Sequence, residues 1–179
     1  MPCREEHDFA AAVIDSLKFA ANEDCIAGKL ALSSLPRLAD VLVRQSGWLD
    51  CELSGYRDTG ERAGKMGLRL QVTGRLSLCC QRCLAEVEFD CVIDNRLLLM
   101  PLGAPEAEWP EDELESDDYD AIPASRELSV RVLVEEEVLL ALPIVPRHAD
   151  CLPPVGGEIE SEESEPSPFA ALAGLKKKH

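Results

Sequence analysis

Four residues in two pairs carry the most specific chemistry of this chain. Cys80 and Cys83 form a Cys-x-x-Cys motif, and two thiolates at this spacing can bind one metal ion or form a strained disulfide. A structural zinc site takes four ligands, and His148 and Cys151 are the other pair at comparable spacing. Together the four would make a three-cysteine, one-histidine zinc site. The alternative is a reduced thiol pair at the end of a hairpin with a solvent-facing histidine.

No other cofactor and no catalytic set is indicated. The three histidines, His7, His148 and His179, lie in regions expected to be loops or termini, so a Ser-His or Cys-His pair has no framework. A thioredoxin-type redox role is disfavoured because no helix is expected to begin after Cys80 and lower its pKa. Phosphate-loop and dinucleotide-binding motifs are missing from the sequence. We therefore predict a protein that is not an enzyme.

Alternating residues predict the hairpin that would carry the first cysteine pair. Apolar residues recur at every second position from Leu68 to Leu78 and again from Val87 to Ile93, which is typical of strands with one buried face. Residues 25–32 and 48–54 have strand patterns as well, so we expect an antiparallel sheet of about four strands. Cys51 and Cys91 fall on apolar sides and should be buried.

One or two helices should pack on this sheet. After Ser33-Ser34 and Pro36, apolar residues recur at helical spacing, which predicts a short helix ending near Gln45; they are Leu35, Leu38, Val41 and Leu42. Residues 128–142 alternate at first, but their length and central glutamates favour a helix that ends before Pro143. The fold class is therefore α+β.

Composition divides the chain into three parts. Residues 1–24 carry mixed signals and are expected to be an N-terminal arm. The core domain is predicted at 25–152, with an acidic loop over 103–124, and residues 153–179 are predicted to be an acidic linker and a C-terminal docking segment. Within this last segment a capped, lysine-terminated stretch carries three apolar residues that could order on a partner: Phe169, Leu172 and Leu175.

The charge balance favours basic proteins as partners. The formal net charge is −16, the wrong sign for a protein that grips nucleic acid through its phosphates, and only 4% of residues are aromatic. The sequence shows no export signal and no apolar stretch long enough to span a bilayer, so we expect a cytoplasmic protein with no membrane partner. In that compartment free or metal-bound thiols are expected in place of disulfides.

Three segments together resemble the YceD family, the large ribosomal RNA subunit accumulation proteins. They are the cysteine motif at 80–83, the acidic helix with its Leu-Pro exit and the residues that follow at 134–148, and the C-terminal segment at 168–172 with the lysines after it. The resemblance implies a role in the accumulation or processing of 23S ribosomal RNA. It implies no mechanism, and only Cys151 follows the Leu-Pro exit where some members have further cysteines.

Three hypotheses follow. The first is an assembly factor whose acidic face and terminal segment hold a basic ribosomal protein or a large-subunit assembly intermediate, so that contact with the RNA is indirect. The second is direct binding of ribosomal RNA through an arginine patch near the hairpin, with Arg75 and Arg82 as its main candidates and Arg69 and Arg96 beside them. An RNA-processing enzyme is the third, and the missing catalytic set disfavours it.

Overall fold

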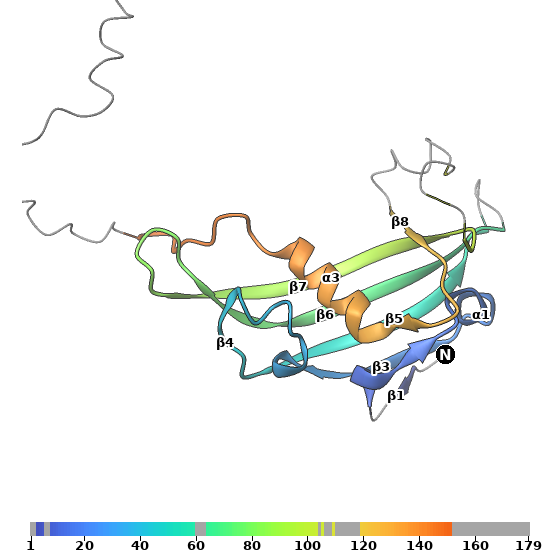
Figure 1. The fold of residues 1–179 in the computed structure, drawn as a ribbon, viewed down its shortest axis with the longest axis horizontal. Coiled ribbons are helices and arrows are strands. Elements are labelled where there is room, and N and C mark those ends of the chain that lie inside the picture. Colours follow the sequence, from blue (N-terminus) through green and yellow to red (C-terminus); the bar gives the residue numbers. More distant parts are fainter. Residues whose placement is uncertain are drawn as a thin grey trace, which may run out of the picture.

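A computed structural model describes residues 3–5, 8–59, 64–103, 105, 109 and 119–151 of the 179-residue chain. The fold in this part of the chain is α+β: a long twisted sheet carries helices on one face (Figure 1). None of the described helices is long and apolar enough to cross a membrane. The elements are β1 (Arg4–Glu5), η1 (Phe9–Ala11), β2 (Val13–Ile14), α1 (Ser16–Ala21), β3 (Cys25–Ala31), η2 (Leu32–Ser34), β4 (Leu42–Arg44), β5 (Trp48–Arg57), β6 (Met66–Cys79), β7 (Glu86–Met100), β8 (Asp120–Pro123), β9 (Leu128–Ser129) and α3 (Val130–Ala141).

The hairpin of β6 and β7 is the longest feature of the sheet. Its antiparallel register runs from Gly67 opposite Leu98 to Cys79 opposite Glu86. The alternation seen in the sequence sends one set of side chains, including Leu70 and Leu76, into the core with no exposure. The predicted hairpin and the predicted burial of Cys51 and Cys91 are confirmed. The strands predicted at 25–32 and 48–54 are confirmed as β3 and β5, which span 25–31 and 48–57.

The predicted count of about four strands was too low. In the described residues the main sheet has seven strands, in the order β1-β3-β5-β6-β7-β8 with β4 on β6, and β2 pairs with β9 in a second small sheet. The additional strands are two to four residues long, too short for an alternating pattern to be recognised. Two of them, β1 and β8, pair in parallel, so the sheet is also not purely antiparallel.

The helix predicted for residues 35–45 was wrong. This stretch follows η2, makes turns and then enters β4, where Leu42 lies opposite Leu78. The backbone amides of Arg37 and Leu38 donate to Oε1 of Glu135 on α3, at 2.6 and 3.4 Å. Tertiary hydrogen bonds and sheet pairing therefore replace the intrahelical bonds that the leucine spacing alone would favour.

The helix predicted for 128–142 is confirmed as α3, with its first two residues in β9 instead. The helix lies across β6 and β7 (Figure 1) and buries Val130, Leu133, Val134 and Val138 in the main core. Its C-cap Leu142 is extended, which is the conformation expected for a residue before proline.

The described residues within 1–24 and 103–124 include elements that pack on the sheet. Phe9 and Phe19 are buried in the main core, and α1 packs so closely on β5 that a Cβ atom at Gly55 would lie 2.5 Å from the carbonyl oxygen of Phe19. Within residues 103–124, β8 pairs with β7. Trp109 and Tyr119 pack in a second cluster with Leu98 and Met100. Residues 104, 106–108, 110–118 and 152–179 lie outside the described residues, and the three-part division stays a prediction.

Candidate metal centre

The turn between β6 and β7 presents Cys80 and Cys83 at one end of the hairpin. The turn is closed by two backbone bonds of 2.9 Å, from the amide of Leu84 to the carbonyl of Cys80 and from the amide of Cys80 to the carbonyl of Ala85. Leu84 adopts a positive φ of 62°, a conformation that costs a non-glycine residue energy. The local backbone therefore holds the two thiols on a tight, strained turn.

The segment after α3 folds back onto this turn. Gln81 holds it by two bonds, from its amide to the carbonyl of Pro146 at 3.0 Å and from its side-chain nitrogen to the carbonyl of Ile144 at 3.3 Å. These bonds bring the residues that follow, His148 and Cys151, to the hairpin end although they are more than 60 positions away in the sequence.

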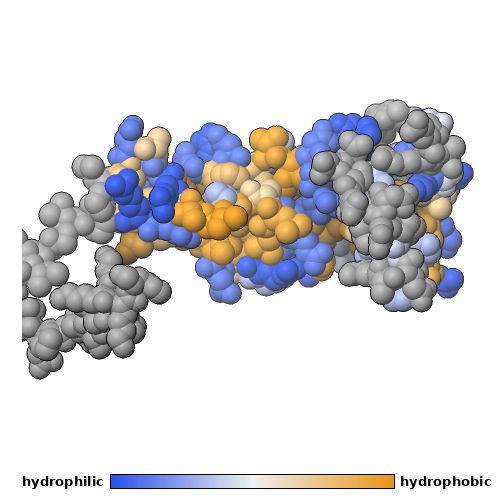
Figure 2. Space-filling model, turned by 90° about the horizontal axis from the view of Figure 1, so that it is seen from above, coloured by the Kyte–Doolittle hydropathy of each residue, from blue (hydrophilic) through white to orange (hydrophobic). Residues whose placement is uncertain are grey.

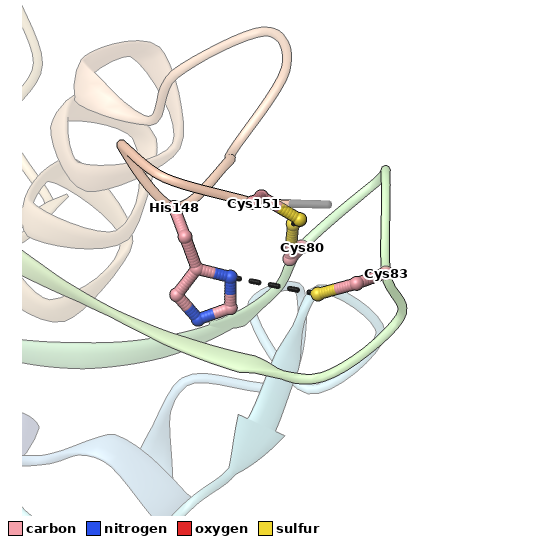
Figure 3. A group of neighbouring side chains, drawn as sticks. All are labelled: Cys80, Cys83, His148 and Cys151. Atoms are coloured by element: carbon pink, nitrogen blue, oxygen red, sulfur yellow. Dashed lines mark hydrogen bonds between the residues drawn. The ribbon is translucent and has the colours of Figure 1, made fainter. Parts of the chain in front are cut away.

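The structure brings together all four residues that the sequence suggested as ligands. Figure 3 shows the side chains of Cys80, Cys83, His148 and Cys151 grouped at the hairpin end, and one ligand atom from each lies within 4.8 Å of all the others. The sulfur atoms of Cys80 and Cys151 are 3.6 Å apart, and Sγ of Cys83 is 3.5 Å from Nδ1 of His148. A tetrahedral zinc ion bound by sulfur and nitrogen needs donors gathered in this way.

The second ring nitrogen of His148 fixes the orientation of the imidazole. Nε2 lies 2.8 Å from the carbonyl oxygen of Glu86, and because a carbonyl oxygen only accepts, Nε2 carries the proton in this bond. Nδ1 then faces Cys83 and is available as a ligand. The bond to Glu86, with smaller contributions from Cys80 and Cys83, raises the pKa of His148 above its ordinary value.

The pKa values of two cluster thiols, Cys80 and Cys151, are shifted in opposite directions. Burial is the largest single effect on Cys80 and raises its pKa, but hydrogen bonds from Cys83, Arg82 and His148, most of them from backbone amides, outweigh it and lower the pKa to about 5. For Cys151, burial and the neighbouring thiols Cys83 and Cys80 raise the pKa to about 11. Cys80 is therefore held as a thiolate at neutral pH, the form that binds a metal.

The other cysteines differ from this cluster. Burial raises the pKa of Cys51 to about 12, as expected for an unreactive core thiol, whereas Cys79 is exposed beside the cluster and is not one of its four members. Cys3 and Cys25 form a disulfide with their Cα atoms 4.6 Å apart. This pair differs from the expected free or metal-bound thiols. Its sequence separation of 22 gave no signal, because only the pairing of β1 with β3 brings the two together.

The candidate partner-binding arginines lie in different surroundings. Arg75 pairs with Asp90 at 3.1 Å and Glu88 at 3.5 Å on the exposed face of the hairpin. Arg69 pairs with Asp94 at 2.6 Å. Arg82 is exposed on the turn between the two cysteines. The remaining candidates, Phe169, Leu172 and Leu175, lie outside the described residues.

Comparison with known proteins connects this centre to one family. A family model described as "Large ribosomal RNA subunit accumulation protein YceD" matches residues 68–176, a range that includes all four members of the cluster and the C-terminal segment. A protein of Haemophilus influenzae with the same description is 29% identical over 174 residues, which cover 92% of this chain and 95% of the relative. No solved structure matches the chain.

Proposed function

This chain belongs to the YceD family, and from that premise we propose that it is a non-enzymatic factor in the accumulation of large-subunit ribosomal RNA. The observation that carries the proposal is the family match, which spans most of the described hairpin, α3 and the cysteine-histidine cluster. The Haemophilus relative, whose name states the same role, supports it along nearly the whole chain.

We place the contact with the assembling subunit on proteins and not on bare RNA. The net charge of −16 repels phosphates and attracts the cationic surfaces of ribosomal proteins. The ion pairs of Arg69 and Arg75 with acidic neighbours further reduce the positive charge that the hairpin can offer to RNA. The partner in this proposal is a basic ribosomal protein or a large-subunit intermediate that contains one.

To test this role, cells are depleted of the protein and their precursor and mature 23S RNA are measured. We expect mature 23S RNA to fall relative to 16S RNA and to recover when the wild-type gene is restored. An affinity-tagged copy should retain large-subunit proteins after nuclease treatment of the extract. Normal 23S RNA levels would contradict the role in rRNA accumulation. Loss of the large-subunit proteins on nuclease treatment would contradict only the proposal that the contact is made through proteins.

Direct RNA binding is the second candidate, because Arg82 is exposed at the hairpin end. Replacing Arg82 by glutamate reverses this charge, and Arg75→Glu does the same within a group of acidic residues. If RNA binds here, crosslinking to 23S RNA should disappear in Arg82→Glu and weaken with rising salt. Unchanged crosslinks in both variants would reject the arginine patch.

We also propose that the cluster of Cys80, Cys83, His148 and Cys151 holds a structural zinc ion. The donor set fits zinc: one nitrogen and three sulfur atoms have converged, the Cys80 thiolate is stabilised by backbone amides, and Nδ1 of His148 is left available by the bond to Glu86. With all four positions taken by the protein, zinc would supply no catalysis. It would tie the hairpin end to the segment after α3.

Replacing Cys80 and Cys83 by serine tests this assignment. We expect freshly purified wild-type protein to contain about one zinc per chain and the double variant to contain almost none, since two of four ligands are lost. Cys79→Ser is the matched control, because its thiol is exposed beside the cluster but is not a member of it. Elemental analysis that finds no zinc in the wild-type protein, or equal zinc in all three, would contradict the site.

A further inference from the structure

An exposed apolar surface lies over the C-terminal end of α3 and the segment that follows it (Figure 2). Its large members are Leu140, Ile144 and Val145, with 77%, 94% and 41% of their surface exposed, and we call them the α3-end surface. Single exposed apolar residues are ordinary, but a contiguous group of this kind usually marks an interaction site.

The α3-end surface is fixed in place next to the metal centre. The backbone carbonyls of Ile144 and Pro146 accept hydrogen bonds from Gln81 on the hairpin turn, so the surface does not move independently of the cluster. Cys151, the last described residue, is held at the same turn by the approach of its sulfur atom to that of Cys80. The chain therefore leaves the described structure close to this surface.

We propose that the α3-end surface is the docking site for the chain's own C-terminal segment, residues 168–175. This segment carries Phe169, Leu172 and Leu175 at intervals of three, which would place all three on one side of a helical turn. The family match continues through this segment to residue 176, so the same family model covers the hairpin, α3 and the segment.

The length of the connecting chain suits this occupant. Residues 152–168 separate Cys151 from Phe169, and 17 residues of a flexible chain span roughly 20–25 Å. Ile144 precedes Cys151 by seven residues, so the two are at most about 25 Å apart. A tether whose mean reach matches the distance gives the segment an effective concentration on the order of millimolar, higher than a free partner reaches.

Charge along the connection also favours docking within the chain. Five glutamates lie between residues 158 and 165. The chain that carries them leaves the structure at Cys151, four residues after Arg147 and in contact with the turn that carries Arg82, and both arginines are exposed. The acidic connection can follow these arginines toward the α3-end surface. A second copy of this strongly acidic chain would instead be repelled.

This inference does not depend on the ribosomal role. While the segment is docked, Phe169 and Leu172 are not available to a ribosomal partner. A partner that binds them must first displace them from Leu140 and Ile144. The α3-end surface and the partner would then compete for the same apolar side chains of the segment.

Methyl NMR on the full-length protein, with zinc bound, tests the proposal. Ile144 is one of six isoleucines, so its δ1 methyl signal reports on the surface, while Ile26 in the core reports on the fold. In Phe169→Asp/Leu172→Asp we expect the Ile144 signal to move and amide exchange of residues 140–146 to rise several-fold, with Ile26 unchanged. The matched control is Ser161→Asp/Ser164→Asp, which adds the same charge to the connection without removing apolar side chains.

A reciprocal variant strengthens the test. Ile144→Asp changes a side chain that is almost fully exposed and should leave the fold intact, yet it should speed amide exchange of residues 169–175 several-fold. Spectra of the Phe169/Leu172 variant that coincide with those of the wild type would overturn the proposal. An Ile144 signal that shifts on about tenfold dilution of the wild type would also overturn it, because it would assign the surface to a second copy.

Discussion

Leu84 is the residue at which the backbone of the hairpin turn is most constrained. It follows Cys83, has a positive φ and is 74% exposed, so its side chain contributes little burial in return for the strain. The conformation is needed because the chain must reverse while the Cys80 carbonyl accepts the amide of Leu84. Glycine adopts this conformation without the steric cost.

We therefore expect Leu84→Gly to stabilise the protein slightly. Relief of the left-handed conformation is worth roughly 1–2 kcal/mol, and the added freedom of the unfolded chain removes about 0.5–1 kcal/mol of that gain. Urea unfolding of the zinc-loaded protein measures the difference. Ala85→Gly, one position further and without a positive φ, should destabilise instead, and a loss of similar size in both variants would contradict the account.

Glu137 is a buried carboxyl whose charge opposes folding. Burial, helped by Asp120 and Glu136, raises its pKa above 4.5, although the side chain of Asn95 donates a hydrogen bond to it. Because the folded pKa is above the unfolded value, the stability linked to protonated Glu137 is fully present below pH 4.5. It is lost as the pH rises through the folded pKa.

Replacing Glu137 by glutamine should remove this loss while the amide oxygen still accepts from Asn95. We expect the stability of Glu137→Gln relative to the wild type to increase between pH 4.5 and neutrality, as measured by denaturant unfolding at several pH values. Glu136→Gln removes only the smallest of the effects that raise the pKa of Glu137, so its trend should be much weaker. A difference that shrinks with rising pH would show that the sign is wrong.

At the scale of elements, α3 orders the irregular chain between η2 and β4. Glu135 is 1% exposed, and its Oε1 accepts the backbone amides of Arg37 and Leu38, which have no helix of their own to bind them. The neighbouring Glu136 is exposed and pairs with the side chain of Arg37 at 3.0 Å. Two adjacent glutamates thus have different roles, set by the face of the helix on which each lies.

This contrast predicts unequal costs of truncation. Glu135→Ala leaves two amides near the core without their acceptor and should cost about 2–4 kcal/mol of unfolding free energy. Glu136→Ala removes only an exposed ion pair and should cost less than about 1 kcal/mol. Chemical denaturation of both variants, with hydrogen exchange at Leu38, measures them. Equal costs would mean that Glu135 is not the anchor of this segment.

For the whole molecule, two crosslinks lie far apart along the chain. The disulfide of Cys3 and Cys25 ties β1 to β3 at one edge of the sheet, and the proposed zinc ion ties the hairpin to the segment after α3. Strand β1 pairs over only two residues, so the covalent bond is its main attachment. Each crosslink secures a terminal part of the fold to the sheet.

Loss of the disulfide should therefore destabilise the whole fold without affecting zinc content. Closing a loop of this length is worth about 3 kcal/mol in the chain-entropy model. We expect Cys3→Ser, Cys25→Ser and the double variant to lose the same amount, because each removes the same bond, and to lose nothing further when a mild reductant is added. Thermal unfolding measures these losses. If Cys3→Ser were as stable as the wild type, the disulfide would not stabilise the fold.

The sequence by itself determined the β6–β7 hairpin, α3 and the two residue pairs proposed as zinc ligands. Alternation, helical length and cysteine spacing are encoded within a few neighbouring residues. Only the tertiary structure decided the rest. Residues 35–45 have helical spacing, but Glu135 and β6 bind their backbone in another conformation, and β1 and β8 exist only because longer strands offer them an edge. The cluster itself also needed the fold, since the bonds of Gln81 bring His148 and Cys151 to Cys80 and Cys83 from a distant part of the chain. Contacts between distant residues depend on the packing of the whole chain, and no short stretch of sequence contains them.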